Sequence, residues 1–364
     1  REYMKIVFVT ECLGSGGAER QMVNLAIMMK NYGHSVHVLT WDSRDFYKRM
    51  LDDNKVPNNV VAIAKKKYLR SFTLSYCVRK MHPDVVISFL PGANIALCIG
   101  RLLGIIRFKL IISERNFTLN WSWRERMISK LYKVADLLIT NSEAERKNYI
   151  SNCEYPTKKI CTIHNFVDTD YFKPSEDKCE SESILVISRI RNYKNTHGML
   201  TAAKILKDKG YAFKIIWVGH DYKDTYSDYI KHKIKDLNIE DIFILVAPNY
   251  DVLKFYQNAS VFCLPSFREG YPNVIIEAMS CGLPILCSNV CENPYIVVDN
   301  INGFLFNPYD TSDIVRAFEV LFMQSDSKRF EMGYRNREKM LKNNTSKEFF
   351  EKYNNVIENM LFKK

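Results

Sequence analysis

The stretch Phe267-Arg268-Glu269-Gly270-Tyr271-Pro272-Asn273-Val274-Ile275-Ile276-Glu277 decides the fold. An apolar run, residues 260–264, precedes it, and the helical pattern of its second half ends at Gly282. A short apolar run, a loop with glycine and proline, and a helical pattern predict a buried strand, a tight loop and a helix. This order is typical of a parallel α/β sheet.

The loop between this strand and helix has the features of an anion site. Proline favours the first helical position, because an N–H group there would lack an intrahelical acceptor, so we expect Pro272 at that position. The amides of Asn273 and Val274 would then point out of the helix N-terminus, where phosphate groups bind readily. The loop therefore predicts a place for a diphosphate.

Two carboxylates, Glu269 and Glu277, flank this predicted anion site. Carboxylates do not attract phosphate, but they accept hydrogen bonds from sugar hydroxyls. Gly270 lets the backbone approach a ligand closely, because it has no side chain. The stretch indicates a ligand that combines phosphate and sugar; the alternative is a surface loop with two solvated glutamates.

Length and composition indicate a globular protein of two domains. The chain has 364 residues, of which 47% are hydrophobic and 26% charged. No stretch is apolar enough to predict a membrane span, and the first strand carries no signal-peptide pattern. The ten cysteines are scattered without zinc spacing, which favours a reducing cytoplasm.

The positive charge is concentrated in the first half. Residues 1–170 hold 26 Lys and Arg against 16 Asp and Glu, a net of 26 − 16 = +10, whereas the rest has 26 − 25 = +1. Such a charge attracts a polyanion, which here means anionic lipid, a lipid-linked diphosphate or nucleic acid.

The stretch from Glu269 to Glu277 resembles the Glu-x7-Glu signature of glycosyltransferase family 4. Enzymes of this family are retaining, depend on nucleotide sugars and have the GT-B fold. The resemblance implies two Rossmann-like domains with parallel sheets facing across a central cleft. It also implies that Glu269 holds the donor sugar and Glu277 the ribose. The other donor-binding residues that it implies in this stretch are Gly270, Tyr271, Pro272, Asn273 and Val274.

The chain opens with a βαβ pattern. Residues 4–10 and 35–41 predict strands, and residues 18–32 predict a helix that Gly33 ends. The turn between the first strand and the helix lacks the Gly-x-Gly-x-x-Gly spacing of dinucleotide-binding proteins. The second strand also lacks, at its end, the acidic residue that binds the ribose of NAD, so the sequence disfavours a dehydrogenase. Gly16-Gly17-Ala18-Glu19-Arg20 resembles the Gly-Gly-x-Glu-Arg turn of family 4. The resemblance implies that the backbone of Gly16 and Gly17 lines the cleft near the diphosphate and the acceptor, so we count both among the donor-binding residues. Arg20 is one of the acceptor-binding candidates.

Strand and helix patterns alternate through the rest of the first half. Ser142 has Glu145 three residues on, a combination that predicts a helix N-terminus. We predict strands at residues 85–90, 109–113, 137–140 and 159–163, and helices at 93–103, 123–135 and 142–149.

Glu114 and Arg115 directly follow the predicted strand at 109–113. Ligands of parallel sheets bind beyond the carboxyl ends of strands. Many family 4 enzymes carry a histidine near this position, and this chain departs from that pattern. Glu114 is our first candidate for contact with the acceptor hydroxyl, and Arg115 is a second acceptor-binding candidate.

Two segments of the first half mix aromatic and basic residues. The first covers residues 65–72 and continues to Arg79 and Lys80, and the second covers residues 121–126 and leads to Lys130 and Lys133. Trp and Tyr beside Lys and Arg suit a membrane interface. A solvated helix face has the same composition, and both interpretations stay open.

The sequence His164 to Pro174 ends a strand and leads into a polar segment, which predicts a domain boundary. It resembles the linker of family 4, with Phe166 in place of a glycine. Asp168-Thr169-Asp170 has the spacing of the DxD metal motif, but we interpret it as part of the linker. The predicted domains are residues 1–170 and 171–345, and a last helix, 346–364, returns towards the first domain.

Arg189 and Lys194 follow a predicted strand, residues 184–188. The pair resembles the diphosphate clamp of family 4. Its physical task would be to stabilise the nucleoside diphosphate, which gains negative charge as the glycosidic bond breaks. The resemblance implies that Arg189, Lys194 and Glu269 are the catalytic residues.

Further patterns complete the second half. His220 stands where the family often has a glycine, and residues 247–249 would pass the nucleobase. Tyr295 replaces a glutamate that relatives often carry, and Asp310 predicts a helix N-cap. We predict strands at 213–218, 242–246 and 284–288, and helices at 196–209, 311–323, 326–341 and 346–361.

We expect a retaining glycosyltransferase that moves a hexose or N-acetylhexosamine from a nucleotide sugar, with UDP favoured, to a glycan acceptor. The basic first domain favours a polyprenyl-diphosphate-linked acceptor of a bacterial surface polysaccharide, although a soluble acceptor stays open. We expect no cofactor, no metal and no nucleic acid. The expected location is the cytoplasm, with peripheral contact to the inner face of the plasma membrane.

Three other functions stay open. A UDP-sugar epimerase shares the fold but needs acid and base carboxylates and no acceptor. A sugar phosphorylase would carry a lysine for pyridoxal phosphate, and we find no such site in the sequence. A non-enzymatic polyanion-binding protein would explain the basic first half, but it would not need the two glutamates.

Overall fold

The computed structural model describes residues 3–63, 69–175, 182–248 and 251–362. The chain forms two compact units, the first from residues 1–165 and 347–364 and the second from residues 166–346. The limits predicted from composition, after residues 170 and 345, stay an interpretation of the sequence. The predictions that lie partly outside the described residues include the basic segment at 65–72, the polar segment at 175–183 and the nucleobase segment at 247–249, as well as the two ends of the chain.

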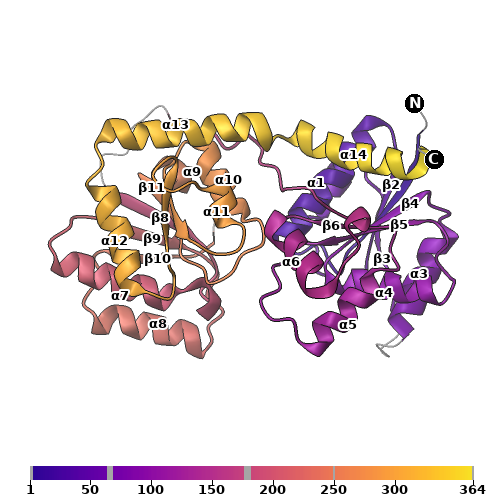
Figure 1. Ribbon diagram of the computed structural model, residues 1–364, viewed down its shortest axis with the longest axis horizontal. Helices are drawn as coiled ribbons and strands as arrows, with labels where there is room; N and C mark the ends of the chain where they lie inside the picture. Colours follow the sequence, from indigo (N-terminus) through magenta and orange to yellow (C-terminus); the bar gives the residue numbers. More distant parts are fainter. Residues whose placement is uncertain (1–2, 64–68, 176–181, 249–250, 363–364) are drawn as a thin grey trace. The chain divides into compact units, whose positions relative to one another are not determined.

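The first unit contains a parallel sheet with the strand order β3-β2-β1-β4-β5-β6-β7 (Figure 1). Its strands are β1 (Lys5–Val9), β2 (Ser35–Thr40), β3 (Asn58–Val60), β4 (Val85–Phe89), β5 (Lys109–Glu114), β6 (Leu137–Thr140) and β7 (Ile160–Thr162). The central strands are apolar on both faces; β4, for example, is buried along its whole length. Buried runs of this kind are expected where helices cover both faces of a parallel sheet.

Helices on one face of this sheet share a core with the strands. The side chains of Leu74, Leu97, Tyr132 and Tyr149 from four successive helices pack with strand residues such as Val86. These helices are α3 (Arg70–Lys80), α4 (Pro91–Leu102), α5 (Trp123–Tyr132) and α6 (Glu143–Cys153).

The last helix of the chain belongs to the first unit and lies beside its first helix. The rings of Tyr32 and Phe350 are 4.9 Å apart, and a ring nitrogen of His34 lies 3.1 Å from Oδ1 of Asn354. The helices concerned are α1 (Gly17–Tyr32) and α14 (Ser346–Phe362), and the remaining helical turns of the unit are α2 (Lys48–Asp53) and η2 (Thr157–Lys159).

The strand order places a topological switch point between β1 and β4. The chain proceeds from β1 outward to β2 and β3, and then returns to pair β4 with the other edge of β1. Ligands of open α/β sheets bind in the crevice at such a point, outside the carboxyl ends of the strands. The two loops there are tied together, because the amide of Gly92 donates to Oε1 of Glu11 at 3.0 Å.

The second unit contains a parallel sheet with the order β10-β9-β8-β11-β12-β13 (Figure 1). Its strands are β8 (Ser183–Ile187), β9 (Lys214–Val218), β10 (Phe243–Val246), β11 (Val261–Leu264), β12 (Ile285–Ser288) and β13 (Gly303–Phe306). The switch point of this sheet lies between β8 and β11, because the chain leaves β8 for β9 and β10 and then returns to the other edge of β8.

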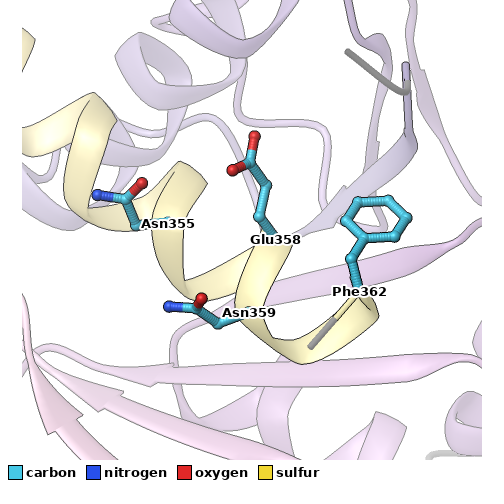
Figure 2. A pocket seen from close by; sticks show the side chains of 4 residues that line it. All are labelled: Asn355, Glu358, Asn359 and Phe362. Atoms are coloured by element: carbon cyan, nitrogen blue, oxygen red, sulfur yellow. The ribbon is translucent and has the colours of Figure 1, made fainter. Parts of the chain in front are cut away.

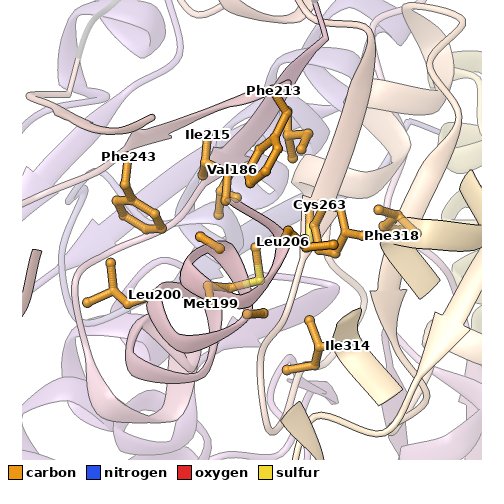
Figure 3. Close-up of a cluster of buried hydrophobic side chains, with 14 of the residues drawn as sticks. Val186, Met199, Leu200, Leu206, Phe213, Ile215, Phe243, Cys263, Ile314 and Phe318 are labelled. Carbon is orange, nitrogen blue, oxygen red and sulfur yellow. The ribbon is translucent and has the colours of Figure 1, made fainter. Parts of the chain in front are cut away.

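Two cores cover the two faces of this second sheet. On one face, Leu206 and Phe318 from two helices pack against Val186, Ile215 and Cys263 of the strands (Figure 3). On the other face, a second cluster includes Tyr256, Ile275 and Met340. The helices are α7 (Thr196–Asp208), α8 (Thr225–Asp236), α9 (Leu253–Gln257), α10 (Asn273–Ser280), α11 (Asn293–Ile296), α12 (Thr311–Phe322) and α13 (Asp326–Asn343), with a short turn η3 (Asn192–Lys194).

The structure confirms the strands predicted from apolar runs and corrects some helix limits. The helix predicted at 123–135 ends at Tyr132, and the one predicted at 142–149 continues to Cys153. Ser142 is the N-cap as predicted, since its hydroxyl accepts from the amide of Glu145 at 3.1 Å. Asp310 caps α12 as predicted.

Candidate active site

The loops that follow β8 and β11 meet at the switch point of the second sheet. The amide of Phe267 donates to the carbonyl of Tyr193 at 2.9 Å, which joins the two loops through their backbones. Asn195 adopts the left-handed conformation, with φ 56°, and its side chain accepts from Gly198 as the N-cap of α7. Its Nδ2 also donates to the carbonyl of Pro308 at 2.9 Å, so the turn that carries Lys194 is fixed from two sides.

An ion pair joins two of the predicted catalytic residues. Nζ of Lys194 lies 2.6 Å from Oε1 of Glu269, and the two side chains are only 16% and 13% exposed. Arg189, the third predicted catalytic residue, is exposed at the end of β8, and its side chain has no hydrogen bond or ion pair with the residues that the structure describes. The structure therefore brings a lysine and a glutamate together at the carboxyl edge of the sheet, and Arg189 follows a strand at the same edge.

The helix after this loop begins one residue later than predicted. Pro272 is the N-cap of α10, with φ −76° and ψ 110°, and Asn273 is the first helical residue. The prediction of Pro272 at the first helical position was therefore wrong. Proline also occurs at the N-cap, where ψ is still that of a strand. The sequence pattern alone therefore does not distinguish the N-cap from the first helical position. The amides of Asn273 and Val274 still belong to the first turn, for which the helix supplies no acceptors.

Glu277 is buried in the second turn of α10, with 4% of its surface exposed. The hydroxyl of Tyr256 donates to its Oε2 at 2.8 Å. This bond holds the carboxylate in a defined orientation beneath the first turn of the helix. Its predicted contact with a ribose stays a prediction.

The side chain of Tyr271, a predicted donor-binding residue, is buried, so only its backbone is available for the predicted contact. Its side chain is 7% exposed and belongs to the core of the second unit. Its hydroxyl accepts from Nδ2 of Asn344 at 2.8 Å. Gly270 precedes it, so the turn offers two successive peptide groups beside Glu269.

In the first unit, the Gly16-Gly17 turn lies at the switch point. Gly16 is the N-cap of α1 and Gly17 is the first helical residue. A Cβ at Gly16 would collide with the carboxylate of Glu19, which therefore lies over the start of the helix. A carboxylate at this end is favoured by the helix dipole. Arg20, the acceptor-binding candidate of this turn, is partly buried in the first turn of α1.

Glu114 and Arg115 lie inside the first unit at the end of β5, with 6% and 5% of their surfaces exposed. Burial raises the pKa of Glu114 to about 7, and the charge of Glu145 adds to this effect. Burial lowers the pKa of Arg115, and the nearby Tyr353 and Glu114 oppose that change. The guanidinium lies 4.9 Å from the ring centre of Phe89. Their predicted role in acceptor binding stays a prediction.

Glu145 has a structural role that the sequence analysis missed. Its carboxylate accepts from the amide of Thr118 at 3.0 Å, from the hydroxyl of Thr118 at 2.7 Å and from Nδ2 of Asn148 at 2.9 Å. Nε1 of Trp121 donates to Asn148 in turn. This cluster fixes the loop after β5, and no local pattern signals it because its members lie 27 residues apart.

The Asp168-Thr169-Asp170 segment forms a turn. Oδ1 of Asp168 accepts from the amides of Asp170 and Tyr171, both at 3.1 Å. Among residues 3–63, 69–175, 182–248 and 251–362, no three His, Cys, Asp or Glu side chains are grouped as a metal site requires. The expectation that the reaction needs no metal stays a prediction.

A hollow beside α14 is lined by Asn355, Glu358, Asn359 and Phe362 (Figure 2). All four side chains come from one helix, and none is a predicted site residue. Within the described ranges, no helix combines the length and the apolar character that a membrane span requires.

Two Rossmann-like units, with charged loops and helix N-termini at their switch points, define a nucleotide-binding protein of the GT-B type. Residues 15–171 match the family model "Glycosyltransferase Family 4", and residues 167–339 match "Glycosyl transferases group 1". The chain belongs to these glycosyltransferases, and it is an enzyme of that class.

Relatives in sequence and solved structures agree with this assignment. A glycosyltransferase of Haemophilus influenzae is 27% identical, over 87% of this chain and 90% of its own. An α-1,4-N-acetyl-D-galactosaminyltransferase of Campylobacter jejuni, whose name includes a diNAcBac-PP-undecaprenol glycan, is 28% identical over 87% of this chain and 89% of its own. The structure of Anabaena Alr3699/HepE in complex with UDP-glucose has a TM-score of 0.85 at 18% identity and covers 98% of this chain and 99% of that one. This last likeness concerns the fold.

Proposed function

We propose that the protein transfers a hexose or N-acetylhexosamine from a UDP-sugar to a lipid-linked glycan, with retention at the anomeric carbon. The observation that carries the proposal is the 2.6 Å pair of Lys194 and Glu269 at the switch point of the second sheet, where Arg189 follows two residues after the end of β8. Cations that suit a diphosphate and a carboxylate that suits sugar hydroxyls thus lie at the same carboxyl edge of the sheet.

The chemistry follows from the charges at this edge. The bond from the anomeric carbon to the diphosphate oxygen breaks, and the electron pair stays on the departing nucleoside diphosphate. Lys194 and Arg189 stabilise that developing charge, and the first-turn amides of α10 add further donors. The oxygen of the acceptor hydroxyl forms the new bond to the anomeric carbon, and its proton passes to an oxygen of the departing diphosphate. Glu277 would hold the ribose hydroxyls.

Relatives support the choice of substrates. The name of the Campylobacter jejuni relative includes an undecaprenol-linked glycan, and its 28% identity extends over 87% of this chain. The Anabaena neighbour binds UDP-glucose in a fold of the same topology. Retention is proposed because the Glu-x7-Glu stretch, present here as Glu269 and Glu277, resembles that of retaining enzymes. We propose that no metal takes part.

A donor panel tests the proposal. UDP-GalNAc, UDP-GlcNAc, UDP-galactose and UDP-glucose are each incubated with the protein and with a synthetic N-acetylhexosamine linked to a short prenyl diphosphate, and UDP release is measured. We expect release from one donor, dependent on the acceptor and unchanged by EDTA. NMR of the product should show the α-anomeric configuration of the donor.

The control is the variant Glu269→Gln, which keeps the size of the side chain but removes the carboxylate charge. We expect it to lose most of the transfer. Conversion of UDP-GlcNAc to another UDP-sugar without an acceptor would identify an epimerase instead. An inverted product, or release that EDTA abolishes, would contradict the proposal.

We further propose that the first unit rests on an anionic membrane through the outer face of α5. Trp123 is 78% exposed and Met127, one turn on, is 58% exposed. Arg124, Arg126 and Lys130 are exposed on the same helix. An apolar strip flanked by cations fits the interface of a bilayer that contains anionic lipid.

The outer face of α3 repeats this pattern on the same layer of helices. Phe72 and Tyr76 are 54% and 46% exposed and their rings are stacked, while Nζ of Lys80 lies 4.8 Å from the ring centre of Tyr76. Leu74 of α3 and Tyr132 of α5 face the same core, so the opposite sides of both helices point away from the sheet. The surface that these faces form would hold the enzyme at its lipid-linked acceptor.

Sedimentation with vesicles tests this surface. The wild type should sediment with phosphatidylcholine vesicles that contain 30% phosphatidylglycerol, and added salt should lower the fraction of protein in the pellet. That fraction should be several-fold smaller for Trp123→Ala. The control Phe330→Ala changes an aromatic side chain of the second unit that is 73% exposed, and it should sediment like the wild type. Equal sedimentation of Trp123→Ala and the wild type would contradict the proposal, and so would binding to single-stranded DNA in preference to vesicles.

A further inference from the structure

The loop after β9 exposes two aromatic rings at the carboxyl edge of the second sheet. His220 and Tyr222 are both exposed, Tyr222 by 38%. Their ring centres are 4.4 Å apart and their planes are nearly perpendicular, at 83°. The proposed transfer reaction does not yet use either side chain.

The backbone of this loop packs directly on the loop that carries Arg189. The amide of Ile190 donates to the carbonyl of His220 at 3.2 Å, and the amide of Gly219 donates to the carbonyl of Val246 at 3.0 Å. A Cβ at Gly219 would collide with the carbonyl oxygen of Ser188, so only glycine allows this approach. His220 therefore stands between the end of β8, next to the diphosphate clamp, and the end of β10.

Charged side chains hold Tyr222 in place. The guanidinium of Arg191 lies 3.7 Å from the centre of its ring and covers one face. Arg191 forms an ion pair with Asp224, which also accepts from the amide of Ser227 as the N-cap of α8. Hydrogen bonding with Lys231 lowers the pKa of Asp221 to about 2, so this residue of the loop is a fixed anion. Tyr222 is thus held by Arg191 from the neighbouring loop after β8, and Asp224 fixes that arginine.

We propose that His220 and Tyr222 bind the nucleobase of the donor nucleotide, and that Arg191 and Asp224 are positioning residues for Tyr222. This inference rests on the proposed function, because it takes the diphosphate to lie at Arg189. With the diphosphate at Arg189, we place the base at the end of β9, which is the neighbour of β8 in the sheet. A base has a flat π-face, and an exposed aromatic ring that is held in place is a surface on which bases stack.

A comparable pair elsewhere in the unit provides the control. Tyr229, on α8, is 44% exposed and its hydroxyl lies 2.9 Å from Nδ1 of His197. It resembles Tyr222 in exposure and in having a histidine partner, but it lies within a helix and not at the strand ends. Tyr229→Ala should therefore leave nucleotide binding unchanged.

Titration calorimetry with UDP and with inorganic pyrophosphate tests the inference. Tyr222→Ala and His220→Ala should each raise the Kd for UDP by roughly five- to a hundred-fold, as loss of one stacking contact does. The Kd for pyrophosphate, which has no base, should stay within two-fold of the wild type. Tyr222→Phe keeps the ring and should bind UDP nearly as well as the wild type.

The outcomes separate the two proposals. If Tyr222→Ala weakens UDP and pyrophosphate equally in folded protein, or if it weakens neither, the nucleobase assignment is wrong. If the wild type itself binds neither ligand, the proposed function fails first. Circular dichroism melting of each variant shows whether it is folded. If Tyr222→Ala is unfolded, His220→Ala, which removes an exposed side chain, provides a second test.

Discussion

Lys194 and Glu269 lie 75 residues apart in the chain and 2.6 Å apart in the structure. Both side chains are mostly buried, so each charge depends on the other for compensation. The glutamate also fixes the position of the ammonium group, which lies on a flexible side chain. The pair thus holds a cation where the proposed diphosphate would leave.

The variant Lys194→Ala should lower kcat/KM for sugar transfer by about 10²–10³-fold, because one fixed donor to the leaving group is lost. The measurement is the rate of UDP release with the active donor. Lys204→Ala is the control, since Lys204 forms an exposed ion pair with Asp208 on α7 and should leave the rate unchanged. A loss of less than three-fold in Lys194→Ala would remove this residue from the catalytic set.

Glu114 should make the stability of the first unit depend on pH. Its pKa is raised from 4.5 to about 7 by burial, so the folded protein binds the proton more tightly than the unfolded chain does. Its contribution is most favourable below pH 4.5 and is lost as the pH rises through about 7. By the standard linkage relation, the full effect is of the order of 3 kcal/mol.

The comparison of wild type with Glu114→Gln isolates this effect. The free energy of unfolding of the wild type, relative to the variant, should fall between pH 5 and pH 9. Urea unfolding at several pH values, followed by tryptophan fluorescence, measures the difference. A difference that stays constant over this range would show that Glu114 titrates normally.

At the scale of elements, the sequence was most informative where strands are buried. The apolar runs of β4, β5 and β6 predicted strands within a residue or two, because both faces of a central parallel strand are covered. The elements missed are the short strands β3 and β13 and the helices α2, α3, α8, α9 and α11. β3 is an edge strand of the sheet with a largely polar composition, so its sequence carries little strand signal.

Contacts between distant parts of the chain were not predictable from local patterns. The signature residues Glu269 and Glu277 and the clamp residues Arg189 and Lys194 were found as candidates, but their pairing was not. The same holds for the hydrogen bond from Tyr256 to Glu277, which joins α9 to α10. The spacing of residues in the sequence identifies the candidate side chains, whereas the order of the strands in the sheet determines which of these side chains contact each other.

Ser142 caps α6, and its removal should destabilise the first unit. Ser142→Ala should cost about 1 kcal/mol, which corresponds to a fall of about 2–4 °C in the Tm of that unit. Differential scanning calorimetry measures the change. Ser325→Ala removes the corresponding cap of α13 in the second unit and should affect the other unit instead. No change in Ser142→Ala would show that the buried hydroxyl contributes nothing.

At the scale of the whole molecule, the sequence of the second unit, residues 166–346, is inserted between the two segments of sequence that form the first unit. The helix α14 returns to unit 1 and buries Phe349, Tyr353 and Ile357 there. The core of the first unit therefore includes residues from both ends of the chain. The second unit has its own cores on both faces of its sheet.

Tyr353→Ala should destabilise the first unit without affecting nucleotide binding. Loss of a fully buried aromatic side chain costs about 3–5 kcal/mol. Hydrogen exchange should show faster exchange in residues 1–165, while the Kd for UDP stays unchanged because its proposed site lies in residues 166–346. Phe330→Ala, a change on the surface, is the control. A large loss of UDP affinity in Tyr353→Ala would show that the units depend on each other.

The central claim is that the switch point of the second sheet binds a UDP-sugar. The measurement that tests it most directly is the Tm of wild type and Glu277→Ala with UDP, GDP, ADP and their sugars, with and without EDTA. A ligand that binds the folded state raises the Tm by mass action. The account predicts a rise with UDP and one UDP-sugar that EDTA does not change and that Glu277→Ala reduces. No rise with any nucleotide in folded protein, or an equal rise in Glu277→Ala, would contradict it.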